Sequence, residues 1–331
     1  MSLAPDDVVR HLHPRAQVPA TPAPTAAGTD HRDTRPRTPL AATARAWAEL
    51  LRLPAMFTAP GDVLAGTAAV GARPGRATLC AIGASVCLYE AGMALNDWAD
   101  QDEDAVARPH RPLPSGRVRP RAALAAAGTL TAAGLALAAC AGRRPLAVAA
   151  PLAAVVWAYD LTLKHTPAGP AAMAAARGLD LLLGAAATDR ALRPALAPAT
   201  TLASHTAAIT LVSRREAEGG SVTAPLAALA ATAAVTSTLS RGPGQADGSR
   251  TGGAAQAALA VGYAATVARP LAHTVLNPSP ALTQRAVGAG IRATVFLQGA
   301  LAARAGAPGT GLLTAALAPV AARLARKVSP T

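Results

Sequence analysis

The sequence predicts an all-α protein, a bundle of about nine or ten membrane-spanning helices. From Ala46 onward, apolar segments alternate with short breaks that are rich in Gly, Pro and Arg. Most of these segments reach the roughly 17–25 residues that a transmembrane helix needs. Patterns typical of strands are absent. The hydrophobic share of the chain is 51%, and because aromatic residues make up only 2%, Ala supplies much of the apolar character.

Ten apolar segments are expected to be helical, and a count of nine results if one of the last three lies at the membrane interface. Because Ala is nearly neutral for membrane insertion, each segment is a weaker signal than a Leu-rich one. A soluble all-α protein is therefore the alternative. In chain order the predicted spans are 46–70, 77–97, 121–141, 145–161, 170–187, 196–213, 222–240, 253–270, 284–303 and 309–325.

The domain organisation follows from the same pattern. Residues 1–44 are rich in Pro, Ala, Thr and Arg without apolar periodicity, which predicts a disordered tail, and residues 45–327 are predicted to form one membrane domain. The net charge of +13 does not indicate nucleic-acid binding, because the Arg residues are scattered between apolar runs without an aromatic platform for bases. Loops that face anionic headgroups or an anionic ligand account for the charge better. None of the three cysteines has metal-ligand spacing.

The most informative segment is an acidic stretch at the end of the 77–97 span. On a helix that continues through it, four oxygen-bearing side chains share an arc of about 100°. Asp102 points away from this arc, and Glu103 borders it. Such a group suits a hard cation such as Mg²⁺, which prefers oxygen ligands. The alternative is a solvated acidic turn. The four residues are Asn96, Asp97, Asp100 and Asp104.

A basic loop follows the acidic stretch directly. Residues 108–117 read Arg-Pro-His-Arg-Pro-Leu-Pro-Ser-Gly-Arg. The prolines stiffen this loop, so Arg111 and Arg117 are candidate fixed cations. Metal ligands beside fixed cations are a combination that suits a diphosphate. The positive loop also favours a cytoplasmic position for this end of the helices.

Together these two motifs resemble the first signature of the UbiA superfamily of intramembrane prenyltransferases, and the resemblance extends over roughly residues 46–326. The chain is most similar to an actinobacterial subgroup related to the prenyltransferase-like member of the Ebo gene clusters. The resemblance implies a helix bundle around a central apolar cavity in the cell membrane. It also implies an isoprenyl diphosphate substrate and Mg²⁺ held by Asp97, Asp100 and Asp104.

A second segment, residues 159–164, ends the fourth predicted span. The family often has Tyr-x-x-x-x-Lys near the diphosphate, and here the matching residues are Tyr159 and Lys164. An interfacial Tyr and a snorkelling Lys are the alternative. Farther on, Arg177 and Asp180 lie three residues apart inside one span. They either form an intramembrane ion pair or line the cavity, where the resemblance expects Arg177 to serve the diphosphate.

A third segment, residues 213–220, departs from the family. Most members have an Asp-rich motif here that binds a second Mg²⁺, whereas this chain has Glu216 and Glu218 after Arg214 and Arg215. On a regular helix the two Glu side chains lie about 160° apart. Glu216 shares a face with His205, so Glu216 is the expected metal ligand. The preceding Arg214 is an expected diphosphate contact. His205 itself is typical of a helix–helix hydrogen bond.

The expected function is Mg²⁺-dependent transfer of a prenyl group from an isoprenyl diphosphate to an acceptor that the sequence does not identify. A terpene cyclase on the same scaffold is one alternative. A non-catalytic isoprenoid-binding membrane partner is another, supported by the altered third segment. A solute transporter fits less well, because its polar groups would gather near the bilayer midplane, whereas these gather at helix ends.

Overall fold

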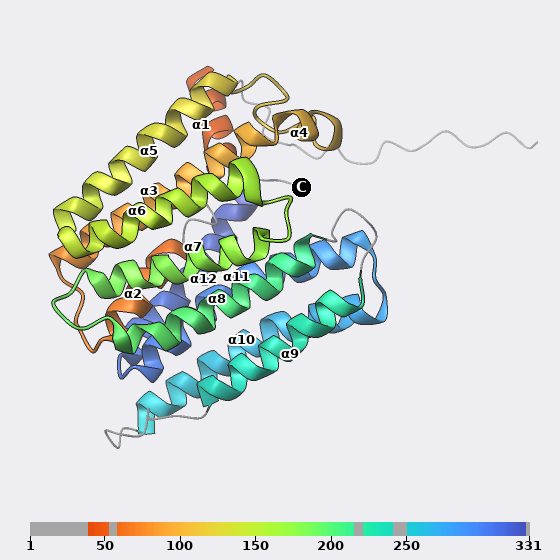
Figure 1. Cartoon of the computed structure of the whole chain (residues 1–331). Helices are drawn as coiled ribbons and strands as arrows, with labels where there is room; N and C mark the ends of the chain where they lie inside the picture. The colour runs from red at the N-terminus through yellow and green to blue at the C-terminus, as the bar shows by residue number, and fades with distance from the viewer. Residues whose placement is uncertain (1–38, 53–57, 215–220, 241–249, 329–331) are drawn as a thin grey trace, which may run out of the picture. The chain divides into compact units, whose positions relative to one another are not determined.

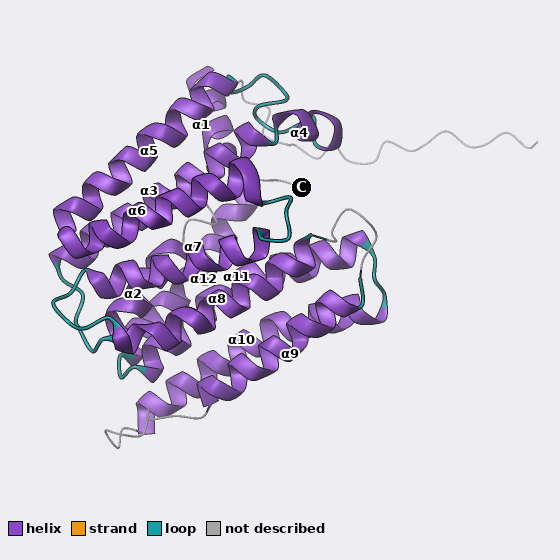
Figure 2. Cartoon of the chain, in the orientation of Figure 1, coloured by secondary structure: helices purple, strands orange, loops and turns teal. Residues whose placement is uncertain are grey.

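The computed structural model describes residues 39–52, 58–214, 221–240 and 250–328 (Figure 1). All the regular elements in these ranges are helices (Figure 2), which confirms the predicted all-α class. In chain order they are α1 (Pro39–Leu50), α2 (Ala59–Ala69), α3 (Arg76–Ala99), α4 (Gln101–Ala107), α5 (Pro120–Ala141), α6 (Arg143–Ala158), the π-helix η2 (Tyr159–Leu163), α7 (Gly169–Ala186), α8 (Arg193–Ser213), α9 (Thr223–Ser240), α10 (Arg250–Leu276), α11 (Pro280–Arg304) and α12 (Pro308–Val328).

The first predicted span, 46–70, is wrong as a single helix. Here α1 ends at Leu50 and α2 begins at Ala59. Arg52 has a φ of 47°, a left-handed conformation that cannot continue a right-handed helix. Each later predicted span corresponds to one helix. At the other end, α1 begins at Pro39, before the domain boundary predicted at residue 45, and the tail up to residue 38 lies outside the described residues.

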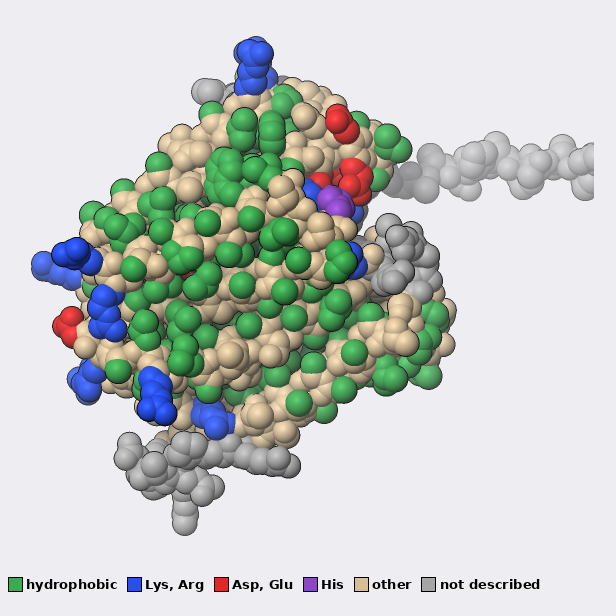
Figure 3. All heavy atoms as spheres, in the orientation of Figure 1, with side chains coloured by type: hydrophobic (Ala, Val, Ile, Leu, Met, Phe, Trp, Pro, Cys, Tyr) green, Lys and Arg blue, Asp and Glu red, His purple; other side chains and the backbone are tan. Residues whose placement is uncertain are grey.

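Six of the helices that the structure describes are long and apolar enough to cross a membrane. They are α3, α5, α6 with its π-helical continuation, α8, α9 and α11. Several large apolar side chains on them and on α10 face outward, among them Leu79, Leu226 and Val261, which are 66%, 55% and 64% exposed. Figure 3 shows hydrophobic side chains across the displayed face, with many of its Lys and Arg side chains near the margins. That distribution suits contact with lipid chains.

The contact between α2 and α7 depends on two glycines. A Cβ on Gly66 of α2 would run into the backbone of Leu181, and a Cβ on Gly184 of α7 would run into the backbone of Val63. Small residues at such contacts let helix backbones approach closely. The close approach places Asp62 of α2 beside α7, and α3 and α8 pack on α7 as well.

Candidate functional site

A cavity of about 460 Å³ lies inside the bundle, with walls supplied mainly by α3, α7, α8 and α11. Apolar side chains such as Leu88, Val156 and Ile209 line much of it. Polar side chains occur at two levels. Asn96 stands near the end of α3, and Ser85 stands on the same helix about 16 Å away at 1.5 Å per residue.

The prediction that one continuous helix runs through the acidic stretch is wrong. Helix α3 ends at Ala99 and α4 begins at Gln101, and Asp100 between them has φ −95° and ψ 10°. Hydrogen bonds persist across the break, since the Asp104 amide donates to the Asp100 carbonyl at 2.8 Å. The break therefore divides the carboxylates between two helices and decides which of them meet.

Arg111 joins two of these carboxylates. Its Nη1 lies 2.6 Å from Asp104 Oδ2 and 3.5 Å from Asp97 Oδ1. Asp97 also accepts from Arg52 at 2.9 Å, and Asp104 from Arg108 at 3.4 Å. Both aspartates are buried, at 4% and 2% exposure. Arg111 is thus the residue of the basic loop that places a positive charge beside Asp97 and Asp104.

Asp100 has a different partner. Lys164 Nζ donates to Asp100 Oδ1, and the two side chains are 10% and 19% exposed. Lys164 directly follows the π-helix η2, and its amide bonds back to the Tyr159 carbonyl at 2.9 Å. A π-turn holds one residue more than an α-turn and is frequent at functional sites. The sequence prediction had linked Tyr159 and Lys164, and the structure places Tyr159 on the cavity wall.

The same turn directs Asp160 into the cavity. Asn96 Nδ2 donates to Asp160 Oδ1 at 3.2 Å, and Asp160 is only 4% exposed. Asn96 also lies 3.5 Å from Arg52 Nη2 through its own Oδ1. Asn96 is thus held between Arg52 and Asp160, at the end of the cavity near the end of α3.

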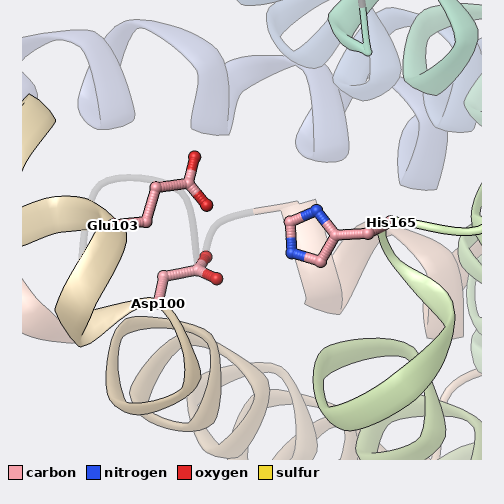
Figure 4. A group of neighbouring side chains, drawn as sticks. All are labelled: Asp100, Glu103 and His165. Carbon is pink, nitrogen blue, oxygen red and sulfur yellow. The ribbon is translucent and has the colours of Figure 1, made fainter.

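Asp100 also belongs to a second group of side chains, shown in Figure 4. One ligand atom each from Asp100, Glu103 and His165 lies within 4.8 Å of the others. Glu103 and His165 are exposed. Two carboxylates and an imidazole can hold a divalent ion. Glu103, which the sequence placed at the border of the predicted arc of oxygen-bearing side chains, therefore lies close to Asp100.

Two of the predicted diphosphate residues bind protein groups instead. Arg117 Nη1 lies 2.5 Å from Glu49 Oε2 of α1, and its Nη2 donates to the His110 carbonyl at 2.6 Å. Burial raises the pKa of Glu49, but hydrogen bonds and charge from Arg117 and Arg45 outweigh it, so this pKa lies below its ordinary value. Arg117 therefore fastens the basic loop to α1.

At the end of α8, Arg214 donates to the Thr166 carbonyl at 2.7 Å and is exposed. It thereby holds the loop that follows Lys164. Glu216, the expected ligand of a second metal, lies outside the described residues, as does Glu218.

The deeper polar level is a buried network. Arg177 Nη1 lies 2.8 Å from Asp62 Oδ2, so the ion pair of Arg177 is with α2. Gln298 of α11 donates to Asp62 at 2.6 Å, and Ser85 of α3 donates to Asp180 at 2.8 Å. The alternative of an Arg177–Asp180 ion pair is thereby corrected, because close packing of α2 on α7 brings Asp62 to Arg177. Arg177 and Asp180 also line the cavity.

His205 is fully engaged in hydrogen bonds. Its Nδ1 lies 3.0 Å from the Tyr263 hydroxyl and its Nε2 lies 3.1 Å from the Gly290 carbonyl. A carbonyl only accepts, so Nε2 carries the proton and Nδ1 accepts from Tyr263. His205 therefore links α8 to α10 and α11, as the helix-contact interpretation expects.

Sequence reasoning missed Arg52 and Asp160. Arg52 precedes a Pro-containing break, and its left-handed backbone turns the side chain to Asp97. Asp160 lies inside the Tyr159–Lys164 segment. Sequence reasoning treated this segment as the end of an ordinary α-helix and did not predict that Asp160 lines the cavity. An Asp near the end of an apolar span was the available signal.

The donor atoms are of the kind that Mg²⁺ prefers, but among the described residues Asp97, Asp100 and Asp104 do not bring their oxygens within 4.8 Å of one another, whereas Asp100 does so with Glu103 and His165. Asp97, Asp100 and Asp104 offer only oxygen atoms, the ligands that this ion prefers. Each of the three carboxylates is bonded to a basic side chain. With a divalent ion bound to these carboxylates, Arg111 and Lys164 would no longer be needed to neutralise them. Their charges would then be available to an anionic ligand.

Comparison with solved structures identifies the architecture. A UbiA homolog from Aeropyrum pernix superposes with a TM-score of 0.59 at 18% identity, covering 78% of this chain and 96% of that one. A UbiA homolog from Archaeoglobus fulgidus, bound to DMAPP and Mg²⁺, gives a TM-score of 0.55 at 16% identity, covering 82% and 99%. At these identities the likeness shows the fold.

Sequence relatives agree over a shorter region. The digeranylgeranylglyceryl phosphate synthase of Methanopyrus kandleri is 38% identical over 123 residues, which cover 37% of this chain and 45% of the relative. That of Halobacterium salinarum is 35% identical over 153 residues, covering 45% and 55%. The chain thus spans about half the length of the curated relatives it matches.

The UbiA prenyltransferase family model matches residues 55–240, more than half of the 331 residues. With six apolar helices among the described residues, this match makes the chain an integral, multi-pass membrane protein. On this evidence, the chain belongs to the UbiA prenyltransferase family.

Proposed function

We propose that this protein is a Mg²⁺-dependent prenyltransferase of the cell membrane, which transfers a prenyl group from an isoprenyl diphosphate to an acceptor. The observation that carries the proposal is the cavity, which is apolar along much of its wall and ends beside buried carboxylates and cations. The bound DMAPP and Mg²⁺ of the Archaeoglobus fulgidus homolog support it. The names of the archaeal relatives, which are synthases of a prenylated phosphate, support it as well.

The proposed roles combine the family resemblance with the contacts of the described residues. Asp97, Asp100 and Asp104 hold the metal, with Glu216 as a further ligand. When bound, Mg²⁺ would offset negative charge on the diphosphate leaving group. Lys164 and Arg111, released from the carboxylates, would bind the diphosphate oxygens and stabilise the charge that develops as the C1–O bond breaks.

Other residues complete the proposed site. Asn96 and Tyr159 contact the diphosphate from the cavity wall. Arg177 bounds the cavity at its deeper level. Arg117 and Arg214 hold the basic loop and the loop after Lys164 in place. We assign these roles to one catalytic domain, residues 45–327, and propose that the protein belongs to the actinobacterial, Ebo-type-like subgroup that its sequence resembles.

The test is binding of an isoprenyl diphosphate to the purified protein across a Mg²⁺ titration. Asp100→Asn should abolish the Mg²⁺-dependent part of binding, whereas Asp102→Asn, which removes an exposed carboxylate two residues away on α4, should not. Unchanged binding by a folded Asp100→Asn variant would refute the metal assignment. Binding without pyrophosphate release would favour a carrier, and a cyclic product formed without acceptor would favour a cyclase.

A further inference from the structure

One oxygen of Asp160 has no partner. Its Oδ1 accepts from Asn96 at 3.2 Å. Its Oδ2 accepts no hydrogen bond from any residue that the structure describes, although Asp160 is only 4% exposed and lines the cavity. A carboxylate oxygen on a cavity wall can accept a hydrogen bond from a bound molecule. The position therefore has a vacant acceptor that faces the substrate space.

The space in front of this oxygen is maintained by a glycine. A Cβ added to Gly92 of α3 would lie 3.9 Å from Asp160 Oδ2 and 3.1 Å from Val156 Cγ1. Any larger side chain at position 92 would occupy the region beside Oδ2. Gly92 therefore leaves room for a small group next to the carboxylate.

Asp160 also lies at the boundary between the charged and apolar parts of the cavity. Lys164, one turn away on the same segment, is bonded to Asp100. The residues on the other side, Gly92 and Val156, present only apolar surface. In the proposed reaction the diphosphate is bound at the charged end and the prenyl chain lies in the apolar part, so the bond that breaks lies between them.

We propose that Asp160 is the residue that receives the proton of a hydroxyl-bearing acceptor. This inference rests on the proposed prenyltransferase function. The C1–O bond of the isoprenyl diphosphate breaks, and the electron pair leaves with pyrophosphate. A lone pair of the acceptor oxygen then forms the new bond to C1. The hydroxyl proton passes to Asp160 Oδ2, which becomes a neutral carboxyl and later returns the proton to solvent.

The experiment separates bond breaking from capture. Geranyl diphosphate carrying ¹⁸O in the bridging position is incubated with the purified protein and Mg²⁺, with water and ethanol as probe acceptors. Exchange of ¹⁸O into non-bridging positions reports that the C1–O bond breaks and re-forms. Geraniol and geranyl ethyl ether report capture. The readout is the ratio of capture to exchange.

Asp160→Asn should lower this ratio by about tenfold or more, because positioned bases commonly contribute at least that much, while exchange continues. Asp102→Asn is the matched control and should leave the ratio unchanged. A ratio equal to that of the wild type overturns the proposal, even if both rates fall together, because such a fall marks a role in holding the site or stabilising the cation.

Gly92→Ala provides a test that keeps the carboxylate. It should reduce ethyl ether more than geraniol, because the added methyl group narrows the space beside Oδ2. An unchanged ratio of ether to geraniol contradicts the placement of the acceptor. If the wild-type protein shows neither exchange nor capture, the proposed prenyltransferase function itself fails, and this result is distinct from the other outcomes.

Discussion

Replacement of Arg177 by Met tests the buried network at the deeper level of the cavity. Its guanidinium lies 2.8 Å from Asp62 Oδ2, and the two side chains are 14% and 0% exposed. Met is similar in length and removes the charge. Asp62 would keep its bond from Gln298, but its charge would lose the only cation that the structure pairs with it among the described residues.

The expected loss of unfolding free energy is about 3–5 kcal/mol, the range found when one partner of a buried ion pair is removed. If Asp62 takes up a proton in the variant, its buried charge is removed, so the loss of unfolding free energy should lie near the lower end of this range. The double variant Arg177→Met, Asp62→Asn should recover part of the loss, because it removes the unpaired charge of Asp62 but leaves the buried Asp180 without the nearby charge of Arg177.

The assay is reversible unfolding in mixed micelles, followed by circular dichroism as the denaturing detergent increases. Arg45→Gln is the control, because Arg45 forms a 3.0 Å pair with Glu49 on a more exposed helix face. Such a pair is expected to contribute less than about 1 kcal/mol. If Arg177→Met is no more destabilising than Arg45→Gln, or if the double variant is less stable than either single variant, the network does not stabilise the fold as described.

Three further predictions concern the site and its supports. Lys164→Met should weaken isoprenyl diphosphate binding by about tenfold or more, because one charge-assisted hydrogen bond contributes about 1.5–3 kcal/mol; equal affinity in a calorimetric titration would contradict the role. Arg111→Ala should impair diphosphate binding far more than Arg117→Ala, since Arg111 lies on the carboxylates whereas Arg117 is bonded to α1; equal effects in the same titration would show that both act at a distance. Gly184→Val should lower thermal stability in detergent and abolish binding, because its side chain would meet the backbone of α2, whereas Gly128→Val, at a position with open space, should do neither.

Some parts of the site were accessible from the sequence because they depend on local spacing. The apolar segments predicted the helices from 77–97 onward. The pattern of Asn96, Asp97, Asp100 and Asp104 predicted a metal-binding segment. Tyr159 and Lys164 were linked because they match the Tyr-x-x-x-x-Lys pattern that the family often has. In each case a few neighbouring residues contain the whole signal.

Other parts depend on contacts between distant segments. The pairing of Asp62 with Arg177 requires α2 and α7 to approach through Gly66 and Gly184. The contact of Arg52 with Asp97 requires a left-handed residue after α1.

The sequence by itself determined the helical class and the order of the apolar segments, because these depend on composition and on the period of the α-helix. Only the tertiary structure decided which charges meet. The break at Asp100 and the π-turn at Tyr159–Leu163 rotate neighbouring side chains away from their ideal helical positions. For that reason Asp100 meets Lys164 and Asp160 faces the cavity.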